Sequence, residues 1–144
     1  MKPALFLRTA SVLSLIHCVL HTVGGVFISP DHGAEEVAVI EAMKSHRFDF
    51  LGSARSYWDF FFGYGLFITI VLFVAAILFW RVAAFVTTSP ALVRSVAGIF
   101  AFNFAAMAIV SWRYFFFAPA LTELLIAACL IVAYAGIGRP SKAV

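Results

Sequence analysis

Two histidines in the first apolar stretch of the chain have a spacing that could support chemistry. His17 and His21 are four residues apart, so they lie on one face of a helix. Ser14 and Gly24 extend that face into a polar or small-residue stripe, which should turn away from lipid toward a bundle interior. Such imidazoles can exchange protons, bind a polar ligand or ligate a metal. The alternative without chemistry is a pair of neutral histidines hydrogen-bonded to neighbouring helices.

Three charged residues fall at the ends of other apolar stretches. Asp59 begins the second stretch, Arg113 ends the third, and Glu123 lies one turn into the fourth. A buried carboxyl group in such a place can act as a general acid or base. The helix dipole and an ion pair with Arg113 give a purely structural reason for the same residues. The candidate catalytic residues are therefore His17, His21, Asp59 and Glu123, with both interpretations open.

The remaining candidates are polar or aromatic side chains expected at comparable depth. They are predicted to bind a ligand, and they are Tyr57, Trp58, Tyr64, Asn103, Arg113 and Tyr114. Asn103 has a second interpretation, because an amide in the middle of a membrane helix commonly bonds to a neighbouring helix. No metal site is predicted from the residues, and the cofactor stays unknown. Cys18 and Cys129 are expected to be small buried hydrophobes, and the sequence leaves a disulfide between them open.

The elements that must position these residues are four apolar runs, in a chain that is 64% hydrophobic and 12% charged. The runs cover about residues 5–28, 57–80, 95–112 and 119–138. Each is close to the ~20 residues that cross a ~30 Å hydrocarbon core, and backbone groups in lipid must bond within their own segment. The prediction is an all-α fold: a four-transmembrane-helix bundle forming a single integral membrane domain over residues 1–144. The first run has no small-residue cleavage site, so it should be retained rather than removed as a signal peptide.

The connection at 29–56 is the one long polar segment. Apolar residues within Glu35–Phe48 recur at roughly helical spacing among charged ones. We expect an amphipathic helix here, between the first and second transmembrane helices, lying on the outer membrane surface or capping the bundle. From there it could cover the candidate site.

Charge placement orients the bundle. When the four runs alternate in direction, one side receives no acidic residue and the other receives all 7. The positive-inside rule makes the acid-free side cytoplasmic, with both termini on it, so the candidate pocket opens outward. The basic residues are too scattered for nucleic-acid binding, which we exclude.

Three segments carry a resemblance to a known family. The stretches KSHRFDFLGSARSYWDFFFGYGL and WRYFFFAP, with HTVGG after the histidines, resemble an uncharacterised family of small bacterial four-helix integral membrane proteins. The chain is also loosely similar to DoxX-like membrane proteins in size and helix count. The resemblance implies a four-helix bundle in the bacterial cytoplasmic (inner) membrane and no settled activity.

The leading hypothesis is a multi-pass membrane protein that binds a small lipophilic molecule in an outward-opening polar pocket. Whether it also performs acid/base chemistry, and so is an enzyme, is left open. One alternative is a non-enzymatic subunit of a membrane complex, and another is a metal or haem site at His17 and His21. The expected partners are the lipid bilayer, a lipophilic ligand, and either a second copy of the chain or another membrane protein.

Overall fold

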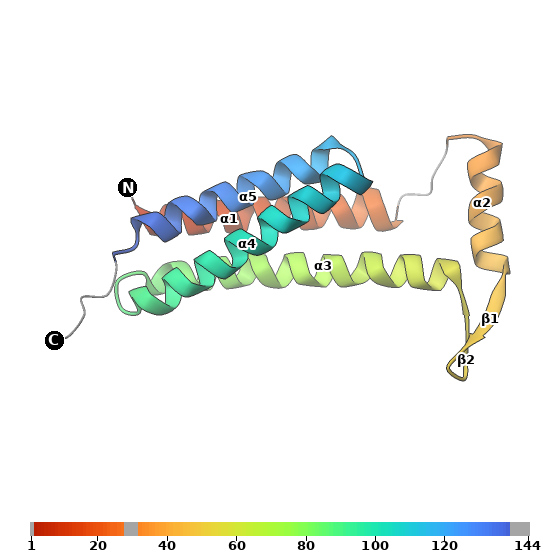
Figure 1. Ribbon diagram of the computed structural model, residues 1–144, viewed down its shortest axis with the longest axis horizontal. Coiled ribbons are helices and arrows are strands. Elements are labelled where there is room, and N and C mark those ends of the chain that lie inside the picture. The colour runs from red at the N-terminus through yellow and green to blue at the C-terminus, as the bar shows by residue number, and fades with distance from the viewer. Residues whose placement is uncertain (1, 28–31, 139–144) are drawn as a thin grey trace. The chain divides into compact units, whose positions relative to one another are not determined.

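The computed structural model describes residues 2–27 and 32–138, and it is mostly helical (Figure 1). In chain order the elements are α1 (Pro3–Leu20), the π-helix η1 (His21–Phe27), α2 (Ala34–Ser45), β1 (Arg47–Phe50), β2 (Ser53–Ser56), α3 (Tyr57–Val82), the 3₁₀-helix η2 (Ala83–Phe85), α4 (Pro90–Tyr114) and α5 (Phe117–Gly136).

Within the described residues, four helical segments are long and apolar enough to cross a membrane, which confirms the four predicted apolar runs. They are Pro3–Phe27, Tyr57–Phe85, Pro90–Tyr114 and Phe117–Gly136. The third begins earlier than the predicted residue 95, because Pro90 occupies the first turn of α4, where its fixed φ and missing N–H are tolerated. The first changes from an α-helix to a π-helix at His21, a change that hydropathy does not reveal.

The structure consists of two compact units, and α1 and α3 each contribute to both. The first unit contains residues up to His17 and from Leu72 onward, and the second is Cys18–Val71. In the first unit α4 and α5 form a tightly packed pair (Figure 1). Small buried residues allow close helix approach there, while larger side chains fill the core. The buried side chains include Ala97, Ala101, Ala127, Ala133, Leu72, Phe79, Phe104, Ile126 and Leu130.

The outward side of this pair is apolar. Ile99, Phe102 and Ile109 on α4 are 64%, 78% and 72% exposed, and Leu124 and Ile131 on α5 are 57% and 53% exposed. A water-facing surface rarely carries so many large apolar side chains together, whereas lipid solvates them at no cost.

The second unit contains the connection between the first and second apolar runs, and it is not wholly helical. The helix predicted over Glu35–Phe48 ends at Ser45, and none of the α2 residues is buried. Arg47–Phe50 instead pairs antiparallel with Ser53–Ser56. Polar and aromatic residues alternate along this first strand, which suits the two-residue period of a β-strand better than a helix.

The turn of this hairpin has an unusual residue. Leu51 and Gly52 connect the strands with φ values of 53° and 80°. Two-residue hairpin turns require this left-handed backbone, which glycine adopts freely and leucine does not. The leucine is also 92% exposed.

Candidate functional site

The predicted site residues divide between the two units. The first unit holds His17, Asn103, Arg113, Tyr114 and Glu123, and the second holds His21, Tyr57, Trp58, Asp59 and Tyr64.

In the first unit the structure brings two candidate catalytic residues together. His17 on α1 and Glu123 on α5 are only 6% and 3% exposed. His17 Nε2 lies 4.0 Å from Glu123 Oε1. That distance is an ion-pair contact that is too long for a direct hydrogen bond, and a single oxygen atom could bridge it.

Two serines complete this arrangement. Ser14 is completely buried one turn before His17 on the same face of α1. The Ser111 hydroxyl, from the end of α4, interacts with the Glu123 carboxyl group. Among the described residues, the Ser14 hydroxyl and Glu123 Oε2 have no hydrogen-bond partner. We call Ser14, His17, Ser111 and Glu123 the buried polar cluster.

Ser111 was not predicted from the sequence. The sequence feature that could have identified it is a hydroxyl residue at the end of the third apolar run, shortly before the turn that leads to Glu123. Because α4 and α5 are antiparallel and joined by a short connection, residues on either side of that turn face each other. Neighbouring Ser11 has a different role, since its hydroxyl donates to the Ala76 carbonyl oxygen at 2.6 Å and ties α1 to α3.

The charge balance around the cluster is simple. Glu123 is the only acidic residue in the sequence of the first unit. His17 can compensate its charge by carrying a proton, or the proton can reside on the carboxyl group and leave both groups neutral. The pair can therefore give a proton to, or accept one from, a third polar group placed between them.

The other candidates in the first unit do not join the cluster. Asn103 is exposed, and its amide donates to Met107 Sδ on the same helix at 3.4 Å. Within residues 2–27 and 32–138 it forms no hydrogen bond to a neighbouring helix. Arg113 is exposed and lies over the ring of Tyr114, 5.2 Å from its centroid. It forms no ion pair with Glu123 in the described chain, contrary to the expected pairing.

In the second unit His21 has a structural role. Its Nε2 lies 2.9 Å from the Gly65 carbonyl oxygen of α3, so a neutral ring would donate there. The next residue, Thr22, forms a hydrogen bond between its hydroxyl group and that of Thr69, with the two oxygen atoms 2.9 Å apart. Cys18 Sγ also donates to the Thr69 carbonyl oxygen. In its contact with Gly65, His21 bonds to a neighbouring helix, as in the alternative without chemistry.

Asp59 is also explained by local structure. Its Oδ2 accepts from the Ser56 backbone N–H at 2.8 Å, and the Ser56 hydroxyl accepts from the Asp59 N–H at 3.2 Å. This reciprocal pair is a capping box, which satisfies two otherwise unpaired groups at the start of α3. The signal was present in the sequence as Ser-x-x-Asp directly before an apolar run.

The aromatic candidates connect α2 and the hairpin to α3. The Tyr57 ring stacks on the His46 ring, with 6.3 Å between their centroids, and its centroid lies 5.0 Å from that of Phe48. Lys44 Nζ lies 5.0 Å from the centroid of Trp58. Tyr64 is 65% exposed, and its ring is roughly perpendicular to that of Phe67. These side chains form a surface layer on the second unit.

No group of three or more His, Cys, Asp or Glu side chains is close enough to hold a metal ion within residues 2–27 and 32–138. His17 and His21 belong to different units. No protein-family model, no curated protein and no solved structure matches this chain. The resemblance to the small bacterial four-helix family therefore stays a prediction.

Proposed function

We propose that this chain is a four-span membrane protein whose buried polar cluster binds a small lipophilic molecule and exchanges a proton with it through His17 and Glu123. The observation that carries this proposal is the burial of the first unit's only acid beside a histidine at 4.0 Å.

Energetics favour a functional reason for these residues. A buried ion pair stabilises a protein little compared with apolar side chains of the same volume, because desolvation offsets the attraction. A buried hydroxyl or carboxyl oxygen without a partner costs about 1–3 kcal/mol. Glu123 Oε2 and the Ser14 hydroxyl both have this property among the described residues. A bound polar group that donates to one and accepts from the other would remove the cost.

These groups also specify the class of ligand. A hydrocarbon skeleton suits the apolar surroundings, and one hydroxyl, carbonyl or amine group suits the 4.0 Å separation of His17 Nε2 and Glu123 Oε1. Such a group can give a proton to or take one from the pair without creating net charge in the bundle. The proposal is limited to binding and proton exchange, and the residues of the buried polar cluster are sufficient for both.

The membrane placement is part of the proposal. The acid-free ends of the spans face the cytoplasm of a bacterial cell, with both termini there, and α2 and the hairpin lie on the outer side of the inner membrane. Glu123, near the start of α5, then belongs to the outer half of the bundle. A lipophilic ligand reaches this depth from the outer leaflet.

The test is the content of the purified protein. We expect an organic extract of wild-type protein, purified in mild detergent, to contain one lipophilic molecule in about equimolar amount. Glu123→Gln should retain about tenfold less, because a hydrogen bond to a charged group is lost. The matched control is Thr122→Val, since the Thr122 hydroxyl bonds to Ala118 of its own helix. Equal retention by wild type and Glu123→Gln would refute the proposal.

A second candidate function, as a subunit of a membrane complex, is favoured by the hairpin tip. Phe50 and Leu51 are 52% and 92% exposed on the second unit. A defined heterologous complex in mild detergent that dissociates when Leu51 is replaced by Asn would support this function. A protein that runs as a monomer or homo-oligomer in wild-type form would exclude it.

A further inference from the structure

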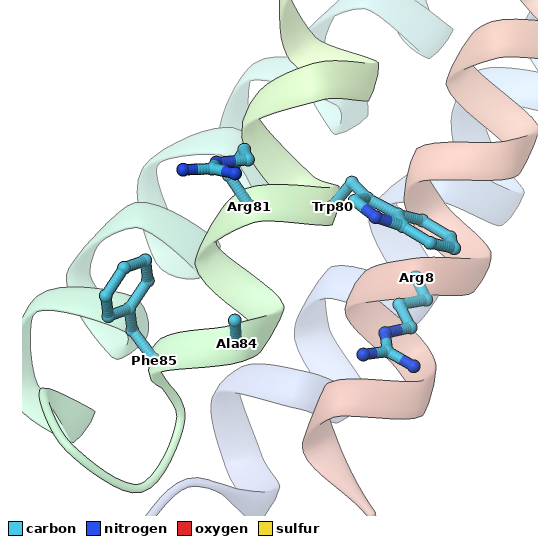
Figure 2. A pocket seen from close by; sticks show the side chains of 5 residues that line it. All are labelled: Arg8, Trp80, Arg81, Ala84 and Phe85. Atoms are coloured by element: carbon cyan, nitrogen blue, oxygen red, sulfur yellow. The ribbon is translucent and has the colours of Figure 1, made fainter.

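A groove in the first unit lies away from the buried polar cluster. It encloses about 200 Å³ and is lined by Arg8, Trp80, Arg81, Ala84 and Phe85. Figure 2 shows the Trp80 indole extending from α3 toward α1, where Arg8 lies beside it. The Arg8 guanidinium carbon is 5.3 Å from the centre of the indole ring, which is a cation–π contact.

Arg8 and Arg81 are both exposed and have no protein acceptor within the described residues. Neither guanidinium group has a hydrogen-bond acceptor or an acidic partner in the part of the chain that the structure describes. Glu123, the single acid in the sequence of the first unit, lies beside His17. His17 is about 13 Å along α1 from Arg8. A guanidinium group carries five N–H donors, and those near lipid need acceptors from another source.

Arg94, in the same unit, is an arginine whose guanidinium group does have acceptors in the protein. Its Nη1 donates to the carbonyl oxygens of Tyr134 and Ile137, each at 2.8 Å. Its guanidinium carbon lies 3.9 Å from the centre of the Tyr134 ring. Arg94 therefore satisfies carbonyl oxygens at the end of α5. The N–H donors of Arg8 and Arg81 remain available to a ligand.

The depth of the groove identifies the acceptor. The spans Pro3–Phe27 and Tyr57–Phe85 are 25 and 29 residues long. At 1.5 Å per residue they exceed the ~30 Å hydrocarbon core and extend beyond it by about 4–7 Å at each end. Arg8 and Arg81 lie about 6–8 Å inside those ends, so their long side chains reach the boundary between hydrocarbon and headgroups. Trp80 is also typical of that boundary.

We infer that this groove binds the phosphate of an anionic lipid headgroup in the leaflet opposite the outer hairpin. Guanidinium groups match phosphate oxygens in geometry and charge. A zwitterionic headgroup suits the groove less well, because the lining residues offer its ammonium group cations and no carboxylate. The exposed apolar faces of Trp80 and Phe85 can contact the glycerol and the upper acyl chain.

The experiment measures lipid retained by the full-length protein. Protein reconstituted into an equimolar mixture of phosphatidylglycerol and phosphatidylcholine is re-extracted in mild detergent, and its lipid is quantified by mass spectrometry. We expect phosphatidylglycerol to be enriched. Arg8→Gln and Arg81→Gln should each reduce the enrichment by about fivefold, since one cation near the surface contributes about that factor.

Two further sets of variants keep the result interpretable. Arg8→Lys and Arg81→Lys retain the charge, so a folded protein with partly restored enrichment supports the site even if the Gln variants unfold. Arg55→Gln removes one charge from the hairpin, where Arg55 bonds to Ala54, and should leave the enrichment unchanged.

Soluble glycerol phosphate identifies the source of the phosphate. We expect millimolar glycerol phosphate to leave the bound lipid in place, because it lacks the acyl chains. Displacement of the lipid by the soluble phosphate would contradict a lipid site. Equal enrichment in wild type, Arg8→Gln and Arg81→Gln would overturn the inference altogether.

Discussion

At the scale of single residues, Glu123 is the one acid in the sequence of the first unit, and its burial carries an electrostatic cost. It is 3% exposed, and the imidazole of His17 is the group beside it that can carry a compensating proton. Removing one member of a buried charged pair is costly, whereas replacing both with apolar side chains is often neutral or favourable. The pair therefore has a distinctive stability signature.

We predict that His17→Leu alone lowers the free energy of unfolding by about 3 kcal/mol, because the carboxyl group stays buried without its partner. His17→Leu with Glu123→Leu should recover most or all of this loss. Denaturant unfolding in detergent measures both, with Thr122→Val as the control. If the double variant were as unstable as the single one, the pair would be required for folding and its functional role would lose its energetic support.

At the scale of elements, the start of α3 depends on the Ser56–Asp59 capping box. We predict that Ser56→Ala destabilises this helix end by about 1 kcal/mol. Asp59→Ala should have a similar effect. The double variant should lose little more stability than either single variant, because both residues belong to the same capping box. Amide hydrogen exchange at the first turn of α3 checks this. Fully additive effects would mean that Asp59 has a separate role.

The hairpin turn gives a second prediction for an element. Leu51 has φ 53°, a conformation that costs a leucine about 1 kcal/mol but suits asparagine. Leu51→Asn should therefore slow amide exchange across β1 and β2. Gly52→Ala should accelerate it, since Gly52 has φ 80°. Unchanged exchange in both variants would show that the turn does not control hairpin stability.

The elements also show how far the sequence predicts the structure. The four apolar runs were predictable because hydropathy depends only on nearby residues. Burial of His17 followed from the polar stripe on α1, but its contact with Glu123 depends on the rotation of α5, which no local pattern gives. Arg113 was expected between two carboxylates and instead turns to Tyr114 for the same reason. The hairpin was hidden because its apolar residues also match a helical period.

At the scale of the whole molecule, membrane topology is the main prediction. In a chain with Cys18 and Cys129 replaced by Ala, a cysteine at Ala54 in β2 should react with a membrane-impermeant maleimide added to intact cells. A cysteine at Thr88, between η2 and α4, should react only after the membrane is opened. Labelling of Thr88→Cys in intact cells, with none at Ala54→Cys, would reverse the orientation and place the arginine groove in the outer leaflet.

The most direct test of the central proposal is an infrared difference spectrum. Purified protein stripped of lipid is compared with the same protein after addition of a total lipid extract from its own host membranes. If Glu123 exchanges a proton with the ligand, the spectrum should contain a carboxyl band that is absent in Glu123→Gln and present in Thr122→Val. An identical difference spectrum in wild type and Glu123→Gln would contradict a proton-exchanging role for this residue.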